Sequence, residues 1–312
     1  CSSDLHGDAY KQRQVKRPTR VVVIGAGTAG IEAACTAAEV GCKTWLFEAK
    51  NHIGGLAVEI ARLPEKKRIA DFPQFLRNRM ARLENLQLHL GQQVQPEQLE
   101  VLRPDLIVNA TGSVPLLPPI AGLHETIDRP GSVVFTITGM IQHLDTFSAL
   151  QGKRIAVVGG GAVGLDVIEY FATQGAEAVL IEMQNSPGRD LDIITKSAML
   201  ALLEQHQVEQ HMDTQLIEVK PDRFRVKNAH HTFDIAFDYG FICLGMCPNR
   251  SGFEAVERWA TARHIKIMNI GDSLKARRII DGVREGRNVL DALEETGALG
   301  SHEATSIPLL TY

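Results

Sequence analysis

Two glycine-rich segments have the residue types and the spacing that bind the phosphates of a dinucleotide. The first, Gly25-Ala26-Gly27-Thr28-Ala29-Gly30, follows the apolar run Val21–Ile24. The second, Gly159-Gly160-Gly161-Ala162-Val163-Gly164, follows Ile155–Val158. G-x-G-x-x-G between a strand and a helix directs backbone N–H groups and the positive end of the helix dipole at a pyrophosphate. The two copies therefore predict two dinucleotide sites.

Each glycine of the pattern has a mechanical role. Gly25 allows the tight turn out of the strand, Gly27 lets a pyrophosphate approach the backbone, and Gly30 lets the helix pack against the strand. The same roles are expected of Gly159, Gly161 and Gly164, and the residues between the second and third glycines (Thr28, Ala29, Ala162 and Val163) are expected to line the two sites.

Both copies are followed by an acidic residue at one spacing. Glu48 lies 23 positions after Gly25, and Glu182 lies 23 positions after Gly159. A carboxylate at the end of the second strand accepts hydrogen bonds from adenine-ribose hydroxyls. Glu182 would also repel a 2′-phosphate, so NADH is favoured over NADPH in the second site, although Arg189 follows closely enough to moderate that preference.

The first site has further features that indicate FAD. Gly54-Gly55-Leu56 follows the ribose acid, as expected where the longer pyrophosphate-ribityl arm passes a second stretch of backbone. An ordinary loop is the alternative interpretation of this glycine pair. The buried strand expected over 105–109 ends in Ala110-Thr111-Gly112. The strand expected over Ile267–Ile270 is followed by Gly271 and Asp272.

These segments must be positioned by alternating strands and helices. We expect a helix from about Ala29 to Val40 and a strand Lys43–Glu48 after the first turn, then the same order after the second. The fold class is α/β, with two Rossmann-like domains arranged as in glutathione reductase and the NAD domain inserted into the FAD domain. The expected boundaries are 1–19 for an arm, 20–125 with 249–296 for FAD, 126–248 for NAD(H), and 297–312 for a tail.

Composition limits the partners. The 312 residues are 44% hydrophobic and 22% charged, with a formal net charge of −4. That charge leaves no basic excess for a nucleic-acid backbone, and no apolar run reaches the roughly 18 to 20 residues of a membrane span. Five cysteines are too few for a disulfide framework, so a reducing, cytoplasmic location is expected. Because the chain begins at Cys1, we expect a processed or excised piece of a longer protein.

The motif order resembles the two-dinucleotide flavoprotein reductases. The resemblance is greatest to the C-terminal half of the NADH:flavin oxidoreductase group that includes 2,4-dienoyl-CoA reductase and trimethylamine dehydrogenase. It extends over about residues 18–295 and is carried, beyond the glycine motifs, by the segments 110–115, 152–159 and 276–286. Complete members have a barrel with FMN and a [4Fe-4S] cluster ahead of these domains, which implies a partner domain or subunit of that kind.

The resemblance also implies roles for single residues. Asp272 would reach the FAD ribityl chain, Val94 would contact adenine through its backbone, and Ala110 to Gly112 would lie beside the flavin arm. Three residues depart from the family: Asp166 replaces a glutamate expected near the nicotinamide, Thr28 replaces a proline, and Leu56 replaces a glutamine.

Other constellations favour structural interpretations. We name no catalytic acid or base, because hydride transfer asks the protein for placement and electrostatics. No redox dithiol is expected, and Cys243 and Cys247 are interpreted as buried structural thiols. His230 and His231 are interpreted as a solvated hairpin, not a metal site, and the charges on the helix Ile279 to Leu293 mostly as a solvent face.

The leading hypothesis is an FAD-dependent NAD(P)H oxidoreductase module that takes hydride from NADH and passes electrons to an FMN- or Fe–S-bearing partner. One alternative is a non-catalytic nucleotide-binding subunit with ADP in place of FAD. Another is a stand-alone NADH oxidase or quinone reductase.

Overall fold

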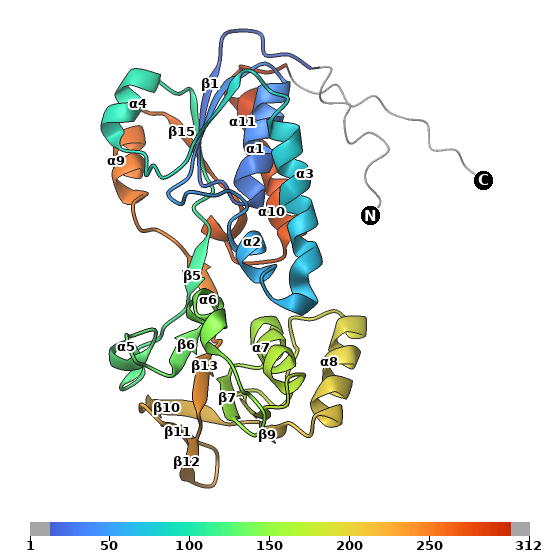
Figure 1. The fold of residues 1–312 in the computed structure, drawn as a ribbon. Helices are drawn as coiled ribbons and strands as arrows, with labels where there is room; N and C mark the ends of the chain where they lie inside the picture. Colours follow the sequence, from blue (N-terminus) through green and yellow to red (C-terminus); the bar gives the residue numbers. More distant parts are fainter. Residues whose placement is uncertain (1–12, 301–312) are drawn as a thin grey trace, which may run out of the picture. The chain divides into compact units, whose positions relative to one another are not determined.

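The computed structural model describes residues 13–300, which separate into two compact units (Figure 1). The first unit consists of residues 13–58, 69–113 and 248–300, and the second consists of residues 59–68 and 114–247. The sequence-based boundaries differ from these units chiefly at residues 59–68 and 114–125. The expected arm (1–19) and tail (297–312) lie mostly outside the described residues.

The first unit is built on a five-stranded parallel sheet. Valines 21 and 23 of its central strand lie in one apolar cluster, and Val22 and Ile24 lie in another, so both faces of the sheet are buried. The strand order is β15 (Lys266–Asn269), β4 (Leu106–Asn109), β1 (Arg20–Ile24), β2 (Lys43–Phe47) and β3 (Leu86–His89).

Helices cover each face of this sheet (Figure 1). One face carries α1 (Thr28–Glu39), α3 (Asp71–Met80), α10 (Ile279–Arg287) and α11 (Val289–Glu295). The other carries α4 (Pro96–Leu102) and α9 (Glu254–Ala262). The short helix α2 (Leu56–Ile60) and the 3₁₀ helices η2 (Pro64–Ala70) and η4 (Gly271–Ser273) lie in the connections.

The second unit repeats the arrangement. Its parallel sheet has the order β6 (Val134–Thr136), β13 (Tyr239–Ile242), β7 (Arg154–Val158), β8 (Glu177–Ile181) and β9 (Glu209–His211). One face packs against α6 (Ile137–Gln142), α7 (Ala162–Ala172) and α8 (Ile193–Gln205). A 3₁₀ turn, η3 (Leu144–Thr146), follows α6.

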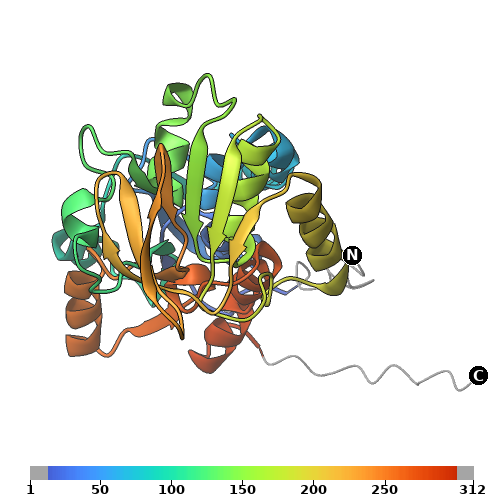
Figure 2. The same cartoon turned by 90° about the horizontal axis from the view of Figure 1, so that it is seen from below.

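A three-stranded antiparallel sheet covers the other face of the second unit (Figure 2). It consists of β10 (Gln215–Val219), β11 (Arg223–Lys227) and β12 (Thr232–Ala236), with α5 (Leu123–Thr126) beside it. The chain leaves and re-enters the first unit through β5 (Ser113–Pro115) and β14 (Met246–Pro248), which pair with each other.

The α/β class with parallel sheets agrees with the sequence prediction, and some elements differ in extent. Residues 66–83, whose apolar spacing is approximately helical, form the end of the 3₁₀ turn η2 and then α3, because Pro73 cannot continue an α-helix from the preceding turn. The single helix expected over 279–293 breaks at Asn288 into α10 and α11. Within residues 13–300, no helix combines the length and apolar character that a bilayer crossing requires.

Candidate dinucleotide-binding sites

The first glycine-rich turn has the geometry that its spacing predicts. Gly25 has φ +103°, and a Cβ there would lie 2.2 Å from the carbonyl oxygen of Ala110. A Cβ on Gly30 would lie 1.9 Å from the carbonyl oxygen of Gly25. A Cβ on Gly27 would meet nothing within 4 Å. Gly25 and Gly30 thus let the turn close, while the backbone at Gly27 faces open space.

Glu48 is fixed beside this turn by two backbone groups. Its Oε2 accepts from the Ala26 N–H at 2.8 Å, and its Oε1 accepts from the Lys50 N–H at 2.8 Å. Each carboxylate oxygen can accept more than one hydrogen bond, so both remain able to accept from a pair of ribose hydroxyls.

The glycine pair Gly54-Gly55 lies against the turn. The Gly54 N–H donates to the Ala26 carbonyl at 2.7 Å, and Gly54 bridges to Gly27 as a parallel strand would. Gly55 has φ +56°, and a Cβ there would lie 3.1 Å from the Cα of Gly27. A side chain at Gly55 would therefore crowd the open backbone. Leu56 follows as the first residue of α2.

The carboxyl ends of β4 and β15 bring the remaining candidates of the first unit together. Gly112, with φ +77°, has open space where a Cβ would be, and Thr111 donates its hydroxyl to Asn109 Oδ1 at 2.8 Å. Asp272 Oδ2 accepts from the Ser113 hydroxyl at 2.8 Å, and the Gly271 N–H donates to Glu285 at 2.7 Å. Ser113 and Glu285 were missed by the sequence analysis.

Val94 is buried with 1% exposure, and its side chain packs in the cluster of Val22 and Phe47. The loop that precedes it is tied to the ribose acid, because the Gln92 N–H donates to the Glu48 carbonyl at 2.9 Å. Val94 thus lies on the loop adjoining Glu48, and its side chain is packed in the apolar cluster.

A buried ion-pair cluster holds α1, whose first residues are Thr28 and Ala29. Glu32 is 2% exposed and accepts from Arg79 at 2.7 Å and from Arg287 at 3.1 Å. Arg79 also contacts Glu39 at 2.7 Å. Arg287 of α10 therefore pairs with a buried carboxylate, and Glu285 of the same helix accepts from the Gly271 N–H. The interpretation of the charges on this helix as mostly a solvent face is wrong for these two residues.

The second glycine-rich turn repeats the first almost atom for atom. Gly159 has φ +104°, and its Cβ would lie 2.2 Å from the Cys243 carbonyl oxygen, while a Cβ on Gly164 would lie 1.9 Å from the Gly159 carbonyl oxygen. Glu182 accepts from the Gly160 N–H at 2.5 Å and from the Gln184 N–H at 2.7 Å.

The loop after Glu182 differs from its counterpart in what it places over the turn. The Gly188 N–H donates to the Gly160 carbonyl at 2.7 Å. Both carboxylate oxygens of Asp190 then accept from the N–H of Ala162, the first residue of α7, at 3.2 and 3.1 Å. A Cβ on Gly161 would lie 3.3 Å from this carboxylate. Neither Gly188 nor Asp190 was predicted, although Gly188 follows Glu182 by the same six positions that separate Gly54 from Glu48.

Asp166 and Val163 lie on the first turns of α7. Asp166 pairs with Lys66 at 2.9 Å, and Lys66 also contacts Glu169 at 3.0 Å. Burial raises the pKa of Asp166, and the charges of Glu169 and Asp190 add to this effect against the opposing effect of Lys66. Burial opposes the charge on Lys66, but its two carboxylate partners outweigh burial and raise its pKa.

The cysteines and histidines do not form a redox or metal centre among residues 13–300. Cys243 is buried, and burial, with a smaller contribution from Asp166, raises its pKa to about 12, which suppresses the reactive thiolate. Cys247 is only partly buried, unlike the expectation, and its thiol donates to the Val114 carbonyl at 3.7 Å. His230 and His231 are exposed on the hairpin between β11 and β12, and no metal-binding cluster occurs in the described part of the chain.

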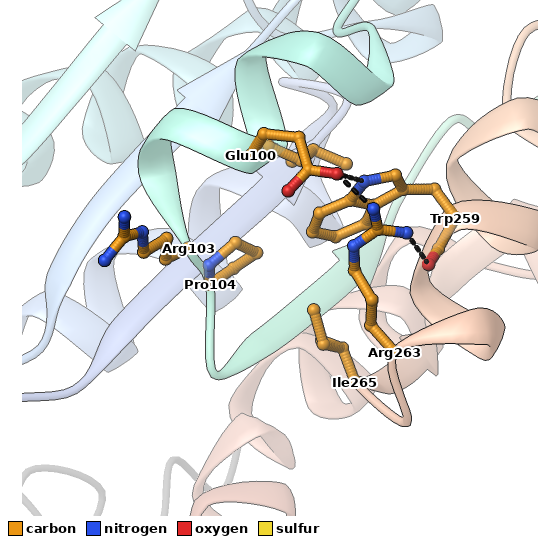
Figure 3. Close-up of a pocket in the computed structure, with 7 residues that line it drawn as sticks. Glu100, Arg103, Pro104, Trp259, Arg263 and Ile265 are labelled. Atoms are coloured by element: carbon orange, nitrogen blue, oxygen red, sulfur yellow. Dashed lines mark hydrogen bonds and ion pairs between the residues drawn. The ribbon is translucent and has the colours of Figure 1, made fainter.

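A cavity of about 300 Å³ lies on the α4/α9 side of the first unit (Figure 3). Trp259 donates its indole N–H to Glu100 at 2.9 Å, and the Arg263 guanidinium covers the Trp259 ring at 4.7 Å. No predicted site residue lines this cavity. A smaller hollow of about 130 Å³ includes Asn109, Asn269 and Ser273 at the ends of β4 and β15, next to the predicted Ala110 and Asp272. This second position is where open α/β sheets bind ligands.

Comparison with known proteins identifies the family. The family model for pyridine nucleotide-disulphide oxidoreductases matches residues 2–71 and, in an overlapping match, residues 19–267. The chain belongs to this family, which is FAD- and NAD(P)H-dependent.

Two curated relatives and one solved structure illustrate the similarity. The chain is 28% identical over 280 residues to an NADH oxidase of Thermoanaerobacter brockii, covering 89% of the chain and 41% of that protein. It is 28% identical to a bilirubin reductase of Mediterraneibacter gnavus, covering 86% and 40% respectively. A 2-naphthoyl-CoA reductase complex matches with TM-score 0.77 and 22% identity over 90% of this chain and 41% of that one. The chain thus spans about two fifths of these proteins.

Proposed function

We propose that this chain is the FAD- and NADH-binding module of a larger oxidoreductase, and that electrons leave it for an FMN- or Fe–S-bearing partner domain or subunit. When bound, the two cofactors supply hydride transfer between nicotinamide and flavin. The chain's own residues bind and orient them. The observation that carries the proposal is the pair of glycine-rich turns, each with its acid bonded to the same two backbone positions.

FAD is assigned to the first turn. Gly27 faces open space, so a pyrophosphate would meet the N–H groups at the start of α1 without a Cβ between. Gly54 and Gly55 extend this bare backbone, and Gly112 continues it at the end of β4. Asp272, already ordered by the Ser113 hydroxyl, would accept from a ribityl hydroxyl. ADP alone would use the turn and Glu48 but would leave Gly112 and Asp272 without a role.

NADH is assigned to the second turn and favoured over NADPH. Both oxygens of Glu182 are held by backbone N–H groups, which fixes a negative charge where a 2′-phosphate would lie. Arg189 donates to the Gln184 side chain at 2.6 Å and so is engaged away from that position.

A partner is proposed from the length of the relatives and from the resemblance described above. The matched reductases extend well beyond the segment shared with this chain. A reducing, cytoplasmic setting is proposed from the small number of cysteines, five in 312 residues, which is few for a disulfide framework.

The decisive experiment is to purify the full chain, add FAD, and remove the excess. We expect a bound flavin absorbing near 450 nm that is bleached by NADH without oxygen, faster than by NADPH. A colourless protein that releases ADP on denaturation would instead identify a structural nucleotide-binding subunit.

A second measurement separates the remaining alternative. Rapid NADH turnover with oxygen or a quinone by the isolated chain would identify a stand-alone oxidase or quinone reductase. Slow turnover that rises when an FMN- or Fe–S-bearing protein is supplied would support the electron-relay function.

A further inference from the structure

The loop 183–192 places a carboxylate where the second turn would hold a pyrophosphate. Asp190 accepts from the Ala162 N–H through both oxygens, at 3.2 and 3.1 Å. This N–H belongs to the first residue of the eleven-residue helix α7 and has no partner within the helix. The carboxylate also lies 3.3 Å from the position of a Cβ on Gly161, the glycine that a pyrophosphate approaches.

The loop is anchored, but its tip is exposed. Pro187 and Gly188 are buried, and Gly188 donates to the Gly160 carbonyl at 2.7 Å. Arg189 and Asp190 are exposed, so withdrawing the Asp190 side chain uncovers little apolar surface. A charged group held at a helix N-terminus by an exposed hydrogen bond is stabilised only modestly.

The first unit shows what the same loop does without this carboxylate. Gly54 and Gly188 each follow the acid by six positions and donate to the equivalent carbonyl, at 2.7 Å in both cases. Two residues further on, the first unit has Leu56 and the second has Asp190. The Cβ position of Gly27 is open, whereas that of Gly161 faces the Asp190 carboxylate.

We infer that Asp190 is a built-in competitor for the NADH pyrophosphate, so that the loop 183–192 gates the second site. This inference rests on the proposed assignment of NADH to the second turn. Asp190 satisfies the helix N-terminus in the free protein and must move away when a dianionic pyrophosphate takes its place. Cofactor affinity is thereby reduced by the work of breaking the Asp190 contact and by repulsion from any carboxylate that stays near.

The test uses the full chain and begins without nucleotide. Asp190→Ala should speed hydrogen exchange at the Ala162 amide, measured by NMR, by about tenfold, since the carboxylate is its only partner among residues 13–300. Asp145→Ala is the matched control, because Asp145 is exposed in the same unit and, among the described residues, makes no hydrogen bond or ion pair with the turn 159–164 or the loop 183–192. This control should leave the exchange rate at Ala162 unchanged.

Titration with NADH then measures the gate. D190A should bind NADH about tenfold more tightly than the parent chain. In this variant NADH does not have to break the charge-assisted hydrogen bond between Asp190 and the Ala162 N–H. Most of this gain should persist in 0.5 M salt, where the Debye length is about 4 Å. A gain in NADH affinity that disappears in salt, or that D145A shares, would show long-range repulsion and overturn the gate.

The two proposals fail in different ways. Unchanged exchange at Ala162 in D190A would overturn the Asp190 contact even if NADH binds. If neither protein binds NADH while exchange at Ala162 does respond, the assignment of NADH to this turn is wrong and the gate falls with it.

Discussion

The two glycine-rich turns of this protein have the same skeleton and different coverings. In each, the first glycine has φ of +103° or +104°, and a Cβ there would lie 2.2 Å from a carbonyl oxygen. A Cβ on the third glycine would lie 1.9 Å from the carbonyl oxygen of the first. Each acid receives N–H groups from the residue after the first glycine and from the second residue after itself. From the first glycine to the acid, the two units therefore have the same backbone geometry and the same hydrogen bonds.

The differences begin after the acid. The first unit continues through Gly54, Gly55 and Leu56 and leaves its turn open, while the second continues through Gly188, Arg189 and Asp190 and covers it. Gly188 of the second unit occupies the place of Gly54, without a second glycine after it. The distinction therefore reduces to Gly55 against Arg189 and Leu56 against Asp190. The glycine-rich turn is common to both units, and we propose that the loop after each acid determines which cofactor binds.

The first prediction closes either turn with a methyl group. Gly30→Ala places a Cβ 1.9 Å from a backbone oxygen in the first unit, and Gly164→Ala does the same in the second. Such overpacking costs roughly 1–3 kcal/mol or more. G30A should bind FAD at least tenfold more weakly and keep its NADH affinity. G164A should bind NADH at least tenfold more weakly and keep its FAD. Absorbance at 450 nm measures bound flavin, and calorimetry measures NADH binding. If G164A lost its flavin while G30A kept it, the assignment of the two sites would be wrong.

A second prediction compares the acids two residues beyond each third glycine. Glu32 is shared by two arginines and fully buried, whereas Asp166 shares one lysine with Glu169. Glu32→Ala should destabilise the first unit by about 3 kcal/mol, because it removes the buried carboxylate that two guanidinium groups share, although Arg79 keeps Glu39. Asp166→Asn should change stability by less than about 1 kcal/mol, because Lys66 keeps Glu169. Denaturant unfolding measures the free energy of unfolding of both variants. Equal decreases for the two would contradict the predicted difference between Glu32 and Asp166.

The pH dependence sharpens this second comparison. Burial raises the pKa of folded Asp166 above its unfolded value near 3.8. The folded state then binds a proton more tightly than the unfolded state, so Asp166 favours folding at low pH and loses that contribution as pH rises through its folded pKa. The stability of D166N relative to the parent chain should therefore increase from about pH 4 to pH 7. A difference that shrinks over this range would contradict the sign of the shift.

The sequence predicts the skeleton because local spacing determines it. Gly25, Gly30 and Glu48 lie within one strand–turn–helix–strand unit, so glycine position and strand length suffice to place them. The helix partners of Glu32 could not be predicted in this way. Arg79 and Arg287 lie 47 and 255 positions away, and only the packing of α3 and α10 against α1 brings them to one carboxylate.

The covering of the second turn was predictable in part. The six-residue spacing from Glu182 to Gly188 is visible in the sequence, but Gly188 lacks the second glycine that marks Gly54-Gly55. The contact between Asp190 and Ala162 depends on how the loop 183–192 folds back, which no periodic pattern encodes. Lys66 likewise precedes Asp166 by 100 positions and meets it through the packing of residues 59–68 on the second unit.

A third prediction exchanges the residues that now define the difference. Gly55→Ala adds a Cβ 3.1 Å from Gly27 at φ +56°, which costs about 1–2 kcal/mol for a left-handed L-residue. FAD affinity should fall about tenfold by that argument. Arg189→Ala, at the equivalent position, should leave NADH affinity within about twofold, because Arg189 contacts only Gln184 among the described residues. Fluorescence titration of both cofactors would decide, and undiminished FAD affinity in G55A would remove Gly55 from the site.

The smallest effect is expected from the two acids, Glu48 and Glu182, which have matching hydrogen bonds but are assigned to different cofactors. Glu182→Gln removes the charge expected to repel a 2′-phosphate while keeping an oxygen that can accept from Gly160. The preference for NADH over NADPH should fall by about fivefold, a change of roughly 1 kcal/mol. Glu48→Gln makes the same exchange in the first unit and should weaken FAD binding without altering that preference. If E48Q changed the NADH/NADPH ratio as much as E182Q, the two turns could not be assigned to different nucleotides, and the matching skeleton would describe two equivalent sites.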